Sequence, residues 1–185
     1  MSSVIFIESN VQIDLTGRDH FRFSDCPGYQ SLNGSGLKEM DVGWMEASSS
    51  TGGAGKLYLL ELKNFGLETL TGRGGHRYPN YAAKAEFIIS ELVRKSIDSV
   101  CMLMAVAAST TYAAQIAPCL PASYGPRTPI QLVHILHFSP SLLPYLPFIN
   151  DEVKSRFRPY QKLFDIVSCT VISHAQAVSI FPNIQ

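Results

Sequence analysis

The run LYLLELKN at residues 57–64 constrains the fold most, because four apolar residues lead directly into an acid and a base. We predict a strand over residues 56–63. Side chains of a strand alternate between its two faces, so Glu61 and Lys63 point to one face, and Leu60 and Leu62 point the other way into a core. A charged pair this close to the protein interior marks a candidate functional site.

A second strand is predicted just upstream, over residues 37–46, and it contains the sequence KEMDVGW. The connector at residues 47–55, ASSSTGGAG, is rich in Gly and Ser and therefore flexible. Two strands joined in this way predict an antiparallel hairpin. Asp41 then meets Glu61 across the ladder, and both carboxylates come within reach of one cation.

The remaining elements predict an α/β fold with a mixed central β-sheet flanked by helices. The first third carries short strand signals, and residues 81–107 favour a long helix, whose second half could instead be a strand. We expect strands at 3–9, 11–15, 20–23 and 131–138, a helix at 151–164 despite Pro159, and a β-rich end at 166–181. Loops are expected at 25–36, 64–80, 117–129 and 139–150. The length of 185 residues suits a single domain, residues 1–185.

Composition excludes several classes of protein. With 46% hydrophobic and 16% charged residues the chain is not disordered. Fifteen basic and fifteen acidic residues give no net charge, so no overall field attracts nucleic acid, and any polyanion site must be local. Affinity for a polyanion would then come from a local groove, a homodimer or a partner protein.

Location is predicted from three further features. The longest apolar run, residues 100–108, is far shorter than the roughly 20 residues that cross a bilayer, so no membrane is expected. The first ten residues lack the basic region of a signal peptide. The four cysteines, at positions 26, 101, 119 and 169, form no CxxC pair and indicate neither a zinc site nor a disulfide-dense secreted fold. We predict a cytoplasmic protein.

The chemistry of the charged group points to a divalent cation. Two carboxylates, a backbone carbonyl and water are the oxygen ligands that Mg²⁺ prefers. Such an ion polarises a phosphoryl oxygen and lowers the pKa of a bound water. Lys63 beside it would position that water or offset charge in the transition state. The set therefore predicts hydrolysis of phosphodiester bonds.

Asp41 followed by Glu61-Leu62-Lys63 at the end of an apolar strand, with a helix and further strands after them, resembles the PD-(D/E)XK nuclease superfamily. The resemblance implies a restriction-endonuclease-like core at about residues 37–138, with an N-terminal β-rich and a C-terminal α/β extension. It implies Asp41, Glu61 and the Leu62 carbonyl as ligands of Mg²⁺ or Mn²⁺, and Lys63 as the catalytic lysine. Met40 departs from the pattern, since the family often has proline there, and the N-terminal helix that frequently adds a Glu is not evident.

Residues that would contact nucleic acid follow the hairpin. The loop TGRGGHRY at 71–78 offers Arg73 and Arg77 beside glycines that let backbone amides approach a phosphate. Lys84, near the start of the predicted helix, is the candidate for an additional polar residue of the site and a contact to nucleic acid. Glu91 and Arg94 are alternatives to it on the same helix.

The sequence thus predicts a metal-dependent endonuclease acting on DNA, with RNA as the other substrate. The alternative is a non-catalytic α/β module that binds protein or nucleic acid through residues 139–150 and the aromatic side chains of Phe148, Phe157 and Tyr160. In that case Glu61 and Lys63 would be a solvated ion pair, which contributes little. Glu39 is predicted to be a surface residue.

Overall fold

A computed structural model describes residues 4–32, 35–47, 55–65 and 78–185. In this part of the chain the elements follow one another in this order: β1 Ile5–Glu8, β2 Val11–Asp14, β3 Asp19–Phe21, η1 Phe23–Asp25, α1 Pro27–Gln30, β4 Val42–Glu46, β5 Lys56–Phe65, α2 Tyr81–Ala107, η3 Ala113–Gln115, η4 Ala117–Cys119, β6 Ile130–Phe138, η5 Leu143–Tyr145, α3 Leu146–Leu163, β7 Ser168–Ser173 and α4 His174–Ile180. The prediction of a mixed α/β fold is confirmed.

The main sheet has five strands in the order β3-β4-β5-β6-β7. The first three are antiparallel, and β5, β6 and β7 run parallel to one another. The predicted β4–β5 hairpin is therefore confirmed, and the long helix α2 makes the crossover from β5 to β6. Parallel neighbours require such a crossover, which explains a helix at this place.

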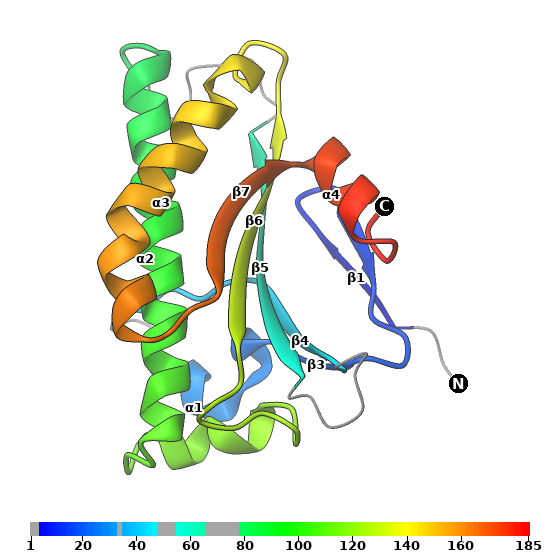
Figure 1. The fold of residues 1–185 in the computed structure, drawn as a ribbon, viewed down its shortest axis with the longest axis vertical. Coiled ribbons are helices and arrows are strands. Elements are labelled where there is room, and N and C mark those ends of the chain that lie inside the picture. Colours follow the sequence, from blue (N-terminus) through cyan, green and yellow to red (C-terminus); the bar gives the residue numbers. More distant parts are fainter. Residues whose placement is uncertain (1–3, 33–34, 48–54, 66–77) are drawn as a thin grey trace.

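Helices α2 and α3 cover one face of the sheet, and the small β1–β2 sheet and α4 cover the other (Figure 1). β5 is consequently buried on both faces. Leu57 and Leu59 pack in the core under α2 and α3, whereas Leu60 and Leu62 pack with β2 and the C-terminal segment. This places Glu61 on the α2 side, because it shares the parity of Leu59.

Several predicted elements differ from the structure. Helix α3 begins at Leu146, inside the predicted loop 139–150, and the short helix α1 lies within the predicted loop 25–36. Only residues 42–46 of the predicted 37–46 strand join the sheet, because the backbone N–H groups of Lys38 and Met40 donate to side chains of α2. The C-terminal segment 166–181, predicted to be β-rich, contains the strand β7 followed by the helix α4. This helix starts at a capping box formed by Ser173 and Gln176.

Strand β7 lies at the edge of the main sheet, and two of its outward backbone N–H groups are covered. The N–H of Val171 donates to Asn150 Oδ1 at 3.0 Å, and the N–H of Ser173 donates to Gln176 Oε1 at 2.9 Å. Side chains thus occupy hydrogen-bonding positions that an exposed edge would offer to another strand.

Cys26 and Cys119 form a disulfide, with their Cα atoms 5.7 Å apart and 93 residues between them in sequence. It links the start of α1 to the segment after α2, where Gly28 packs so closely that an added Cβ would lie 2.6 Å from the Gln115 backbone. The cytoplasmic location stays a prediction, and the cysteines no longer support it, since disulfides persist mainly in oxidising compartments. Within the described ranges, no helix has the length and apolar character needed to cross a membrane.

Candidate active site

The β4–β5 register brings the two predicted metal ligands together. Val42 pairs with Leu60, so Asp41, one residue earlier, lies beside Glu61. The Asp41 carboxylate extends the ladder, because its Oδ2 accepts a hydrogen bond from the Leu62 backbone N–H at 2.7 Å. The side chain of Asp41 is therefore fixed next to the Glu61-Leu62-Lys63 segment.

Contacts to α2 hold the chain just before Asp41. The Lys38 N–H donates to Asp98 Oδ2 at 3.0 Å, and the Met40 N–H donates to Ser99 Oγ at 2.8 Å. The Lys38 ammonium also forms an ion pair with Glu91. These bonds position Asp41 against the middle of α2, and they do so without a regular strand.

The middle of α2 contributes a lysine that the sequence analysis did not select. Lys95 Nζ lies 2.7 Å from the Glu61 carboxylate, donating to Oε2, and 3.4 Å from Asp41 Oδ1. Lys63 Nζ lies 3.0 Å from Glu61 Oε1. Two carboxylates and two ammonium groups thus form one cluster, in which the side chains of Lys95, Asp41 and Lys63 are 13%, 15% and 26% exposed.

Glu61 is the buried centre of this cluster, with no exposed surface. Burial raises the pKa of Glu61 to about 7, and the neighbouring Asp41 carboxylate adds to the rise, against the opposing effect of Lys95 and Lys63. Its Oε1 lies 2.7 Å from Lys95 Nζ and 3.0 Å from Lys63 Nζ, so both ammonium groups face this oxygen. Both lysines therefore stabilise the Glu61 carboxylate, but burial and Asp41 outweigh them in the pKa.

Burial lowers the pKa of Lys95, but the carboxylates of Glu61 and Asp41 outweigh burial and raise it above its ordinary value. Lys95 is consequently a stable cation at neutral pH. Its ammonium supplies a positive charge from the helix to both carboxylates of the hairpin, Asp41 and Glu61.

A divalent ion fits the donor set of this site. Asp41 Oδ1 and the Glu61 carboxylate already face one shared cation, the Lys95 ammonium, at 3.4 Å and 2.7 Å. Among the residues that the structure describes, no group of three or more His, Cys, Asp or Glu side chains is placed to hold a metal. The Leu62 carbonyl and water would have to complete the coordination, as Mg²⁺ accepts.

Next to the cluster lies a buried histidine. His134 is the register partner of Glu61 on β6, and burial lowers its pKa to about 3, so it is neutral. Its Nε2 lies 3.0 Å from Ser96 Oγ, whose hydroxyl donates to the Leu92 carbonyl at 2.9 Å. Nε2 therefore carries the proton and donates to Ser96. His134 therefore fills a structural position beside the cluster.

The residues predicted to contact nucleic acid or to add a polar group to the site lie outside the cluster or outside the described residues. Arg73 and Arg77 lie outside the described residues. Lys84 is buried on α2, 4% exposed, and burial lowers its pKa. Arg94 donates to the Gly36 carbonyl on the outer side of α2. Nucleic-acid contacts by the first three residues stay predictions.

Glu39, predicted to be a surface residue, is directed away from the cluster, because its carboxylate accepts a hydrogen bond from the Tyr29 hydroxyl. The sequence did contain a signal for Lys95. It lies three residues after buried Leu92 and four before buried Ser99, on the stripe of α2 that faces the sheet. A lysine at such a position needs a buried partner.

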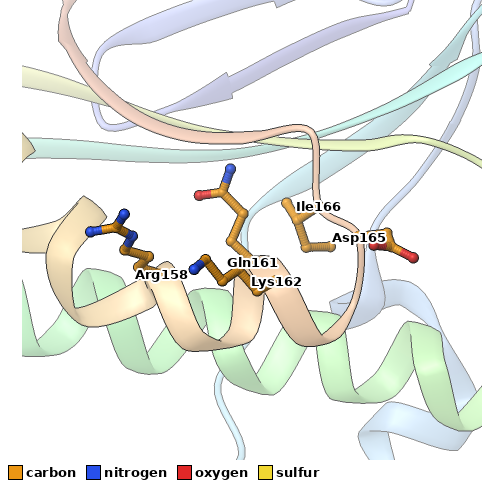
Figure 2. A pocket seen from close by; sticks show the side chains of 5 residues that line it. All are labelled: Arg158, Gln161, Lys162, Asp165 and Ile166. Atoms are coloured by element: carbon orange, nitrogen blue, oxygen red, sulfur yellow. The ribbon is translucent and has the colours of Figure 1, made fainter.

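The site does not coincide with a surface cavity at the C-terminal end of α3, of about 370 Å³. That cavity is lined by Arg158, Gln161, Lys162, Asp165 and Ile166, none of which belongs to the cluster (Figure 2).

Comparison with known proteins identifies no relative: no family model matches the chain, and neither the curated proteins nor the solved structures include a significant match. The class that fold and site define is an α/β domain with a mixed five-stranded sheet and a buried carboxylate–lysine cluster at its antiparallel hairpin.

Proposed function

We propose that this chain is a Mg²⁺-dependent nuclease of the PD-(D/E)XK type, with a restriction-endonuclease-like core, which hydrolyses phosphodiester bonds of DNA. One observation carries the proposal. Asp41 and Glu61, from adjacent antiparallel strands, converge on a single cationic position, with Lys63 Nζ 3.0 Å from Glu61. Mn²⁺ would serve as the alternative ion and RNA as the alternative substrate.

In this reaction the chain's own residues would divide the work. Asp41, Glu61 and the Leu62 carbonyl would hold the ion, which when bound supplies Lewis acidity to a phosphoryl oxygen and to water. Lys63, the more exposed of the two lysines, would orient the attacking water and offset negative charge on the phosphate. Hydrolysis forms a bond from water oxygen to phosphorus and breaks the ester bond, and the leaving oxygen takes up a proton.

The test is Lys63→Ala in a cleavage assay with Mg²⁺ or Mn²⁺ on single-stranded and duplex DNA and on RNA. We expect cutting to fall by about 10²–10⁴-fold, the usual contribution of a positioned general acid or base. Lys56→Ala, at the other end of the same strand, is the matched control and should cut normally. Full metal-dependent cleavage by Lys63→Ala, with unfolding transitions alike in all three proteins, would remove the proposal.

A second function is favoured by the charge balance of the cluster. Two lysines already oppose the two carboxylates, which also suits a non-catalytic α/β module that binds protein or nucleic acid. Of the aromatic residues predicted to form its surface, Phe148 is 50% exposed, but Phe157 is fully buried in the core and cannot contact a partner. A chain that binds nucleic acid equally well with Asp41→Asn and Glu61→Gln, and cuts nothing, would be such a module.

A further inference from the structure

Lys95 occupies the position that the proposed function requires for a metal ion. Its ammonium is the one described cation that contacts both carboxylates, at 2.7 Å from Glu61 and 3.4 Å from Asp41. We propose that Lys95 is the resident counter-ion of this site, and that a divalent ion binds by displacing the Lys95 ammonium from Asp41 and Glu61. The inference rests on the proposed function and adds a control on metal binding to it.

The charge of the cluster supports an exchange over simple addition. When both carboxylates are ionised, Asp41, Glu61, Lys63 and Lys95 together carry no net charge, and Glu61 is fully buried. A divalent ion added beside both lysines would leave two uncompensated positive charges in a site with little water, which is costly. Departure of the Lys95 ammonium reduces the excess from two positive charges to one, and it frees the carboxylate oxygens of Asp41 and Glu61 for the ion.

The geometry allows the ammonium to leave on one side. Glu61 closes the interior of the site, whereas Asp41 and Lys63 retain some exposure. The contact of Lys95 with Asp41 is the longer of its two contacts, and a lysine ends in a flexible four-carbon stem. The ammonium can therefore move past Asp41 into the solvent while the helix stays in place.

The measurement is Mn²⁺ binding by isothermal titration calorimetry, with the full chain and no nucleic acid. Lys95→Met removes the ammonium and keeps a chain of similar length, so Mn²⁺ should bind about tenfold more tightly or better, equivalent to about 1.4 kcal/mol. Lys63→Met is the matched control, because Lys63 contacts Glu61 alone, and its effect should be smaller. Adding Glu61→Gln to Lys95→Met should abolish the gain.

Lys95→Arg provides a second test in case the Lys95→Met variant does not fold. Unfolding curves are recorded for each protein. A guanidinium holds carboxylates with a planar fork and stays charged, so this variant should bind Mn²⁺ more weakly than the wild type. If the wild type binds Mn²⁺ and the folded Lys95→Met variant binds it equally or more weakly, the proposed displacement of Lys95 by the ion is overturned. The nuclease proposal would remain intact in that case. Absence of Mn²⁺ binding in every variant would overturn both.

Discussion

Replacing Glu61 with Gln should change how the stability of the protein depends on pH. The folded-state pKa of Glu61 is raised from 4.5 to about 7, because the carboxyl is buried. Between these values the folded protein retains a proton that the unfolded chain has released. The contribution of Glu61 to wild-type stability therefore falls as pH rises from 4.5 to 7, and the loss is complete above pH 7.

The size of this effect follows from the shift itself. At about 1.4 kcal/mol per pKa unit, the rise from 4.5 to about 7 corresponds to roughly 3 kcal/mol. Glutamine does not ionise, so the stability of Glu61→Gln relative to wild type should increase by about 3 kcal/mol between pH 4 and pH 8. Any constant cost of the weaker Lys95 contact cancels in this comparison between pH values.

The assay is urea unfolding in EDTA across this pH range, followed by the fluorescence of Trp44, the single tryptophan, which is buried. Glu86→Gln provides a control of opposite sign, because a hydrogen bond from Arg156 lowers the pKa of Glu86. The free energy of unfolding of the wild type should increase relative to that of Glu86→Gln as pH rises through the acid range. A stability difference for Glu61→Gln that stays flat, or shrinks, from pH 4 to pH 8 would refute the reasoning.

Two further predictions concern the link between α1 and the segment after α2. Loss of the Cys26–Cys119 disulfide, by reduction or by Cys119→Ser, should lower the free energy of unfolding by about 4 kcal/mol, because the bond closes a long loop. Chemical denaturation with and without reductant measures this change. Unchanged denaturation midpoints would contradict the prediction. Gly28→Ala should destabilise the folded protein by about 1–3 kcal/mol, because the added Cβ would meet the Gln115 backbone. Thermal unfolding tests this prediction. Gly125→Ala is the control and should unfold near the wild-type temperature, because nothing lies within 4 Å of a Cβ added there.

The parts of the fold that sequence predicted are those set by local pattern. The alternation around Leu60 and Glu61 fixed the two faces of β5. A helix from Tyr81 to about Ala107 was predicted, although its second half was left open to a strand, and the structure shows one helix over the whole range. The start of α4 was missed although its capping signal, Ser173 followed by Gln176, is in the sequence, because the β-branched residues around it favour a strand.

What sequence could not supply depends on contacts between distant residues. Lys95 meets Glu61 only after α2 folds back over the sheet, and nothing in the spacing of 34 residues indicates that contact. The pairing of Cys26 with Cys119 is equally non-local. Segment 37–41 was predicted as part of a strand, yet the N–H groups of Lys38 and Met40 donate to side chains of α2 instead.

The covered edge at β7 bears on how copies of this chain can assemble. With the Val171 and Ser173 amides already engaged by Asn150 and Gln176, the main sheet cannot grow by continuous strand addition on that flank without first losing those bonds. A two-fold assembly that brought two carboxylate–lysine clusters to one nucleic-acid duplex would therefore be built through helices, loops or the opposite flank at β3.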